Sequence, residues 1–350
     1  MYPFDPAAKP FGTTAAGEEV FLITLKNDTL ACEILTYGAT LRSLFVSDRS
    51  GTRRDVVLGY DTLQEYETQD GYLGATIGRY ANRIANGRFR INEQTYSVAT
   101  NNGENHLHGG RVGFSHRVWT IEELCSDKVC LSLVSGHMEE GYPGKLNVRV
   151  TYSLHQNALA IHYSAVSDAD TICNLTNHSY FNLAGHSSGP IYDQEIMITA
   201  QSYTPTDAHS IPTGQIAPVE STPMDLRLFH KIGSHLADDF PQLTQAGGYD
   251  HNFVVDGQPG TLRPAAKARF AAAGIAMEVD TTLPGIQFYT ANFLEDGRVG
   301  KDRCSYGPQH GFCLETQFFP DSPNQLSFPS ALLKAGEVFD HKTVFSFHVF

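Results

Sequence analysis

The stretch that decides the fold is residues 146–164, LNVRVTYSLHQNALAIHYS. Apolar and polar side chains alternate through residues 146–154 and again through residues 159–163. Alternation with a period of two is typical of a β-strand that buries one face and exposes the other. Gln156 and Asn157 interrupt the pattern where a turn would join the two strands. This stretch therefore predicts an antiparallel hairpin with one buried face.

Similar alternation recurs along the rest of the chain. It predicts further strands at residues 20–25, 31–46, 89–91, 96–98, 129–133, 195–199, 266–279 and 343–350. Helical signals are few and short: residues 61–66, which Asp61 would cap, and residues 236–243. The sequence therefore predicts an all-β protein, a large antiparallel β-sandwich with few short helices and long functional loops.

The composition restricts the kinds of protein that this chain can be. Its 350 residues exceed the usual length of one domain, but large β-sandwiches run this long, and we expect a single domain over residues 1–350. A formal net charge of −13 argues against a nucleic-acid or anionic-membrane partner, because such binding depends on Lys and Arg. No apolar run approaches the roughly 20 residues that span a bilayer, and the first residues lack a signal peptide. Six scattered cysteines without a C-x-x-C pair are expected to be reduced thiols, so we expect a cytoplasmic protein.

Two titratable residues stand in apolar stretches that are predicted to be strands. His178 lies in the segment TNHSYFNL and Glu315 in the segment GFCLETQFF. A glutamate between large apolar residues is rarely idle, because burying it without a partner costs several kcal/mol. A strand histidine, taken alone, is more often a hydrogen-bonded structural residue. One His and one Glu on rigid strands nevertheless indicate proton-transfer chemistry without a cofactor.

The segment NHLHGG places His106 and His108 two residues apart. On a strand they would face the same side and could bind a metal ion. Such a site needs a further acidic ligand nearby, but Arg111, Val112 and Gly113 follow instead. We therefore expect no metal site, and one of these histidines would donate a hydrogen bond to a neutral ligand.

Planar polar side chains and aromatic rings recur beside these segments, as they do in sugar-binding sites. Arg83 follows Asn82 in GRYANRIANG, although a surface arginine paired with an acid is the simpler interpretation. Asp250, in GYDHNF, accepts hydrogen bonds as sugar hydroxyls require, although an Asx-turn would also explain it. Gln287 and Tyr180 lie in two aromatic-rich stretches.

Taken together and in order, these segments resemble the aldose 1-epimerase family, the galactose mutarotases. The resemblance covers nearly the whole chain and is carried by YGATL (37–41), LGY (58–60), GRYANRI (78–84), LHGG (107–110), GYPG (141–144), TNHSYFNL (176–183), DHNF (250–253) and LETQ (314–317). It implies a β-sandwich with an open cleft that holds a free hexose. It also implies Glu315 as general base and His178 as general acid. Arg83, His108 and Asp250 would bind the substrate, with Asn82, Gln287 and Tyr180 in matching segments.

The resemblance implies interconversion of the α and β anomers of a free aldohexose such as galactose or glucose, with no cofactor and no metal. The protein would be a monomer or a homodimer. Three alternatives stay open from the sequence. A glycosidase or lyase would use Asp250 and Glu315 as a carboxylate pair and release reducing sugar. A hexose-phosphate epimerase would need more basic residues near Arg83. A sugar sensor would bind sugar without interconverting its anomers.

Overall fold

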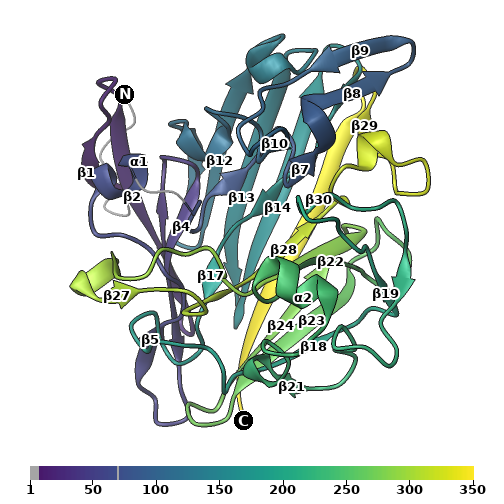
Figure 1. Ribbon diagram of the computed structural model, residues 1–350. Helices are drawn as coiled ribbons and strands as arrows, with labels where there is room; N and C mark the ends of the chain where they lie inside the picture. The colour runs from purple at the N-terminus through teal and green to yellow at the C-terminus, as the bar shows by residue number, and fades with distance from the viewer. Residues whose placement is uncertain (1–7, 69–70) are drawn as a thin grey trace.

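The computed structural model describes residues 8–68 and 71–350, and three large sheets carry the fold (Figure 1). The first has nine strands, in spatial order β11 (Thr120–Leu124), β12 (Lys128–Ser135), β13 (Leu146–His155), β14 (Ala158–Ser167), β30 (Val338–Val349), β24 (Ile275–Thr281), β23 (Arg263–Phe270), β18 (Glu195–Ile198) and β21 (His230–Lys231). The second has six strands, in spatial order β17 (Tyr180–Phe181), β28 (Phe312–Gln317), β25 (Gly285–Tyr289), β22 (Asp250–Val254), β19 (Ser202–Tyr203) and β20 (Ala217–Pro218).

The third sheet is a five-stranded meander in chain order, with β1 (Ala8–Thr13), β2 (Glu19–Lys26), β3 (Ala31–Leu35), β4 (Thr40–Ser47) and β5 (Arg53–Asp55). Two-stranded pairs complete the β-structure, namely β7 (Arg83–Ile84) with β10 (His106–Leu107), β6 (Thr76–Ile77) with β16 (Thr176–Asn177), β8 (Arg88–Ile91) with β9 (Gln94–Ser97), β15 (Thr171–Ile172) with β29 (Leu332–Leu333), and β26 (Arg298–Val299) with β27 (Ser305–Tyr306). The strands of the large sheets pair antiparallel, as the sequence predicts.

The hairpin predicted at residues 146–164 is confirmed as β13 and β14. Leu154 pairs with Leu159, and Gln156 adopts a left-handed φ of 51° in the turn. Two other predicted strands are wrong, because each is a hairpin. Residues 31–46 form β3 and β4, since Gly38 and Ala39 turn the chain with φ of 67° and 43°. Residues 266–279 belong to β23 and β24, separated by a turn in which Gly274 has φ of 66°.

Two short α-helices occur in the described ranges, α1 (Leu63–Thr68) and α2 (Pro241–Ala246). The first lies where it was predicted, but Thr62 caps it rather than Asp61. The Thr62 N–H donates to Glu65 Oε2 at 2.8 Å and the Glu65 N–H donates to Thr62 Oγ1 at 3.4 Å, a capping box. The second helix starts at Pro241 instead of residue 236, because proline suits the first helical position. No helix of these ranges is long and apolar enough to cross a membrane.

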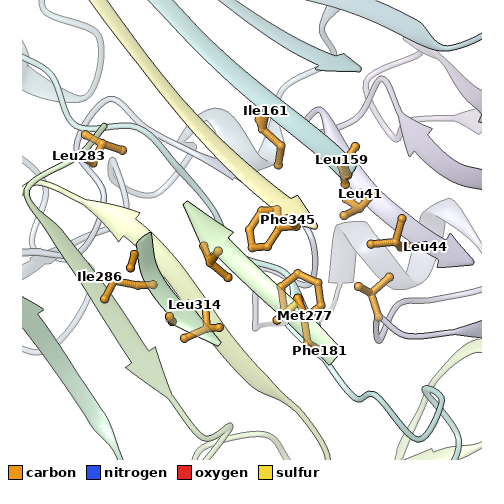
Figure 2. Close-up of a cluster of buried hydrophobic side chains, with 14 of the residues drawn as sticks. Leu41, Leu44, Leu159, Ile161, Phe181, Met277, Leu283, Ile286, Leu314 and Phe345 are labelled. Carbon is orange, nitrogen blue, oxygen red and sulfur yellow. The ribbon is translucent and has the colours of Figure 1, made fainter. Parts of the chain in front are cut away.

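The main apolar core fills the space between the nine-stranded sheet and the other two, which makes the fold a β-sandwich. Figure 2 shows side chains of β4, β14, β24, β25, β28 and β30 converging there. Phe181 of β17 contacts Phe345 of β30 with ring centroids 5.1 Å apart, which joins the two layers. Burying such apolar side chains stabilises the packing of the two layers, and it fixes which face of β28 points away from the core.

Candidate active site

The face of the six-stranded sheet that lies away from the main core is polar. On β28, Phe312 and Leu314 belong to that core, so the alternating residues Cys313, Glu315 and Gln317 point to the opposite side. The neighbouring strands place further polar side chains on this face by the same alternation. The six-stranded sheet is therefore a rigid platform. Its apolar face packs on the main core, and its opposite face carries the polar side chains.

A cleft with a volume of about 440 Å³ lies over this platform. Its lining includes six of the eight predicted site residues, Asn82, Arg83, His108, Tyr180, Asp250 and Glu315. The other two, His178 and Gln287, are 4% and 2% exposed and contact the lining residues Glu315 and Asp250. Segments that are distant in sequence therefore meet in one polar, partly enclosed space.

Glu315 and His178 form the centre of this space. His178 Nε2 lies 3.6 Å from Glu315 Oε1, while the second carboxylate oxygen, Oε2, is buried without a hydrogen-bond partner. Burial raises the pKa of Glu315 well above its ordinary value; the charge of Asp250 adds to this and Arg83 opposes it. Burial also lowers the pKa of His178 to about 4. Both shifts favour uncharged side chains, so the pair is poised to exchange protons with a bound molecule.

The ring of His178 is held from two sides by tyrosines. Tyr180 stacks on it with centroids 5.0 Å apart and an interplanar angle of 23°, and Tyr72 stacks at 5.9 Å and 29°. The backbone is fixed as well, because the His178 N–H donates to Ala75 O and its carbonyl accepts from the Gly74 N–H, both at 2.9 Å. Gly74 is required there, since its φ is 72° and a Cβ would come within 2.1 Å of Leu41 O.

His108 presents a hydrogen-bond donor to the cleft. Its Nδ1 accepts from the Asn82 N–H at 3.1 Å, so the proton of the neutral ring lies on Nε2. Burial, together with His178 and Arg83, keeps the pKa of His108 well below its ordinary value and the ring uncharged. Asn82 Oδ1 in turn accepts from the Arg83 N–H at 2.8 Å, which fixes the turn that carries Asn82 and Arg83.

The expected common facing of His106 and His108 is wrong. Strand β10 ends at Leu107, and His108 has a left-handed φ of 53°, so the two side chains diverge. His106 contacts Ala99 O and the Tyr142 hydroxyl instead, at 2.6 and 2.5 Å. A pair of histidines at this spacing is therefore not the basis of a metal site.

A different trio is close enough to consider as metal ligands, because one donor atom each of His108, His178 and Glu315 lies within 4.8 Å of the others. A histidine that binds a metal ion normally donates from its other ring nitrogen. The Nδ1 of His108 accepts a backbone proton instead, so its Nε2 carries hydrogen and cannot ligate. This donor set fits hydroxyl groups better than a cation.

Asp250 is oriented by a chain of amides across three strands. Its Oδ1 accepts from Gln287 Nε2 at 2.7 Å, and Gln287 Oε1 accepts from Gln317 Nε2 at 3.2 Å. Arg83 Nη1 lies 3.8 Å from Asp250 Oδ2, and its Nε donates to Asn102 Oδ1 at 3.2 Å. Gln287 thus orients Asp250 through a hydrogen bond. Arg83 and Asp250 face the cleft as a pair of charged groups.

Sequence reasoning missed several residues of the cleft, namely Tyr72, Tyr289, Phe293 and Arg298. Tyr289 could have been found, because it lies two residues after Gln287 on β25 and so shares its face. Phe293 stacks on Tyr289 at 6.2 Å and is 64% exposed at the rim. Tyr72 and Arg298 come from irregular or very short segments that carry no periodic signal.

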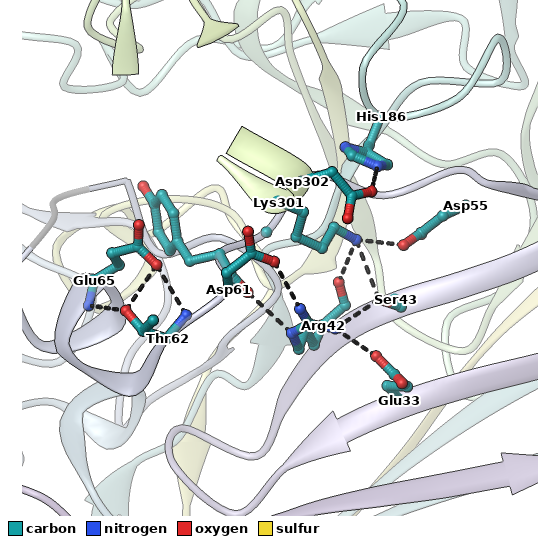
Figure 3. A network of polar contacts seen from close by, with 12 residues as sticks. Glu33, Arg42, Ser43, Asp55, Asp61, Thr62, Glu65, His186, Lys301 and Asp302 are labelled. Atoms are coloured by element: carbon teal, nitrogen blue, oxygen red, sulfur yellow. Dashed lines mark hydrogen bonds and ion pairs between the residues drawn. The ribbon is translucent and has the colours of Figure 1, made fainter. Parts of the chain in front are cut away.

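A buried lysine, Lys301, follows the rim residues Phe293 and Arg298 in the chain. Figure 3 shows its polar contacts with the meander. Lys301 Nζ donates to Asp55 Oδ2 at 2.5 Å, to the carbonyls of Arg42 and Val57 at 2.8 Å each, and to Ser43 Oγ at 3.2 Å. This lysine is 3% exposed, and its donors are fully used. It ties the rim of the cleft to β4 and β5 of the meander.

The fold and the cleft together define a class: a large β-sandwich that carries a polar cleft with a buried acid–base pair on one sheet. Residues 22–346 match the aldose 1-epimerase family. The galactose mutarotase of Bos taurus is 47% identical over 325 residues, which cover 93% of each chain. The aldose 1-epimerase of Escherichia coli (strain K12) is 35% identical over 336 residues, covering 95% of this chain and 96% of that protein.

Solved structures agree with these relatives. The aldose epimerase homologue from C. elegans superimposes with a TM-score of 0.87 at 29% identity, covering 94% of this chain and 98% of that one. The protein described here belongs to the aldose 1-epimerase family. The family and the β-sandwich predicted from the sequence are thereby confirmed.

Proposed function

We propose that this protein is an aldose 1-epimerase, a mutarotase that interconverts the α and β anomers of free aldohexoses such as galactose and glucose. The observation that carries this proposal is the contact of 3.6 Å between Glu315 and His178 at the wall of the cleft, with both groups buried. An acid and a base side by side are what opening and reclosing a hemiacetal ring requires.

In the proposed mechanism, Glu315 takes the proton of the C1 hydroxyl while protonated His178 gives a proton to the ring oxygen. The bond between C1 and the ring oxygen breaks, and an open-chain aldehyde results. Rotation about C1–C2 then presents the other face of the carbonyl. Reclosure uses the same residues in reversed roles and yields the other anomer, so no net proton is gained or lost.

The surroundings of the pair suit this exchange. Burial raises the pKa of Glu315 and lowers the pKa of His178 to about 4, which makes ionised Glu315 a stronger base and protonated His178 a stronger acid. The uncharged pair is the favoured resting form, and transfer of one proton from Glu315 to His178 gives the ion pair that ring opening converts back into two uncharged side chains. The ionised and the uncharged arrangement hold the same number of protons, so the two steps need no proton from solvent.

The remaining site residues are proposed to hold the sugar while C1 turns. His108 would donate from Nε2 to a hydroxyl, and Arg83 and Asp250 would bind neighbouring hydroxyls as donor and acceptor. Asn82, on the lining, would add amide contacts. Tyr180 would pack against the sugar as well as against His178, and Gln287 would act through Asp250.

Polarimetry of freshly dissolved α-D-galactose, with and without the protein, tests the proposal. Catalytic amounts should speed the approach to anomeric equilibrium beyond the uncatalysed rate, and repeats with glucose would compare the two hexoses. An unchanged rate with saturable galactose binding would contradict the proposal and favour a sugar sensor. Release of reducing sugar from a glycoside, or activity confined to hexose phosphates, would instead support the two enzymatic alternatives.

We further propose that residues 1–350 form a single catalytic domain that works in the cytoplasm as a monomer or a homodimer. A sugar would be its only ligand, with no cofactor, and activity insensitive to EDTA would support this. Sedimentation of the purified protein would distinguish the two oligomeric states.

A further inference from the structure

One strand, β28, contacts both ring nitrogens of His178. Cys313 and Glu315 lie two residues apart on this strand and face the same side. Cys313 Sγ is 3.5 Å from His178 Nδ1, and Glu315 Oε1 is 3.6 Å from Nε2. The Cys313 side chain is fully buried and does not line the cleft, so it reaches a bound sugar only through the imidazole.

We propose that Cys313 is a positioning residue that accepts the Nδ1–H of His178 and so leaves Nε2 as the nitrogen that exchanges protons in the cleft. This inference rests on the proposed function. It makes two neighbouring histidines opposite tautomers, because His108 carries its proton on Nε2. His108, which would bind the sugar, is a fixed donor from Nε2. His178, which would exchange protons, has the lone pair of its Nε2 beside Glu315.

The chemistry of sulfur explains why a cysteine suits this position. A thiol sulfur is a weak, uncharged acceptor, so it orients Nδ1–H without stabilising the charged ring as a carboxylate would. Burial raises the pKa of Cys313 well above its ordinary value, with Glu315 adding to the effect, so the group stays a thiol. A weakly held imidazolium gives up its Nε2 proton readily, which the ring-opening step requires.

Nitrogen-15 NMR of the imidazole rings reads the tautomer directly and does not depend on activity. At neutral pH we expect His178 of the wild type to carry its proton on Nδ1. Cys313→Ala should give a mixture of tautomers and lower kcat about three- to tenfold, the effect of losing one weak hydrogen bond, with KM unchanged. Cys313→Ser keeps an acceptor and should restore the Nδ1–H signal and kcat to within about twofold.

Cys32 provides the matched control, because it is a fully buried thiol of β3 in the apolar core. Cys32→Ala should leave kcat and the His178 signals unchanged. The proposal is overturned if wild-type His178 carries its proton on Nε2, or if Cys313→Ala changes neither tautomer nor kcat. Equal losses of kcat in both Cys313 variants with an unchanged tautomer would reduce the contact to packing and also overturn it. A wild type with the Nδ1–H signal but no mutarotation would refute the proposed function and leave the tautomer assignment supported.

Discussion

Lys301 and Glu315 are buried to nearly the same degree, 3% and 2% exposed, but their surroundings differ. Lys301 Nζ has four acceptors within hydrogen-bond distance for its three N–H donors, one of them the carboxylate of Asp55 (Figure 3). Glu315 has one oxygen 3.6 Å from a histidine and the other without a partner. A buried ion with all its partners in place holds two parts of a fold together, whereas a buried carboxyl that lacks partners keeps its capacity for reaction.

Removing the reactive carboxyl should produce the largest change. Glu315→Gln preserves the size of the side chain but not its basicity, and we expect kcat for mutarotation to fall roughly 10²- to 10⁴-fold. Polarimetry measures the rate, and circular dichroism should show an intact fold. A variant with a near-normal rate would remove Glu315 from the chemistry, and with it the contrast to Lys301.

The structural lysine should give the converse result. Lys301→Met leaves the largely buried carboxylate of Asp55 without its cation, and we expect a loss of about 3–5 kcal/mol in the free energy of unfolding. Urea unfolding measures this loss. Lys267→Met is the matched control, because Lys267 pairs with Glu278 at a half-exposed site on the nine-stranded sheet, where loss of the pair should change stability by less than about 1 kcal/mol. Equal stability of the two variants would show that the buried network is not structural.

His108 is intermediate between Glu315, which lacks hydrogen-bond partners, and Lys301, which has a full set. His108 is buried and has one partner, Asn82, but its Nε2–H faces the cleft. We expect His108→Leu to raise KM for galactose about tenfold through the lost donor, with a smaller effect on kcat. If kcat fell as far as in Glu315→Gln while KM stayed constant, His108 would belong to the proton-transfer machinery instead.

The smallest expected effect is a dependence of stability on pH. Burial raises the pKa of Glu315, so the native carboxyl keeps its proton at pH values at which the unfolded chain has lost it. Its contribution to stability is therefore complete below its unfolded pKa of about 4.3 and declines as the pH rises above that value. Glu315→Gln should raise Tm relative to the wild type at pH 7 but not at pH 4, as calorimetry would measure. The opposite sign would mean that Glu315 is stabilised as an anion.

Glu315 and Lys301 also differ in how far the sequence alone could reveal them. Strands with one apolar face, such as β13 and β14, follow from alternation alone, because the same physics of burial acts on every second residue. Glu315 was recognisable for the related reason that a carboxyl has no place in an apolar strand unless it acts there. The network of Lys301 left no such trace, since its partners lie on β4, on β5 and just after β5, roughly 250 residues away in the chain.

Backbone geometry accounts for most of the errors. The direction of His108 depends on one left-handed residue, which reversed the facing expected from its spacing to His106. Residues 31–46 were divided by the turn at Gly38 and Ala39, although their hydrophobic pattern continues across it. Tyr72 reaches the cleft from a loop, where neither the strand period of 2 nor the helix period of 3.6 applies. Hydrophobic periodicity does not encode the conformation of loops and turns, and cleft residues are concentrated in these segments.

The position of β30 has a consequence for the synthesis of the protein. This strand, residues 338–349, lies in the middle of the nine-stranded sheet, between β14 and β24 (Figure 1). Until it emerges from the ribosome, the growing chain has two long strands whose inner edges are unpaired, and exposed edges of this kind recruit other chains. The sheet closes only after β30 has been synthesised, so a ribosome that stalls between β24 and β30 leaves an incomplete sandwich that is prone to aggregate.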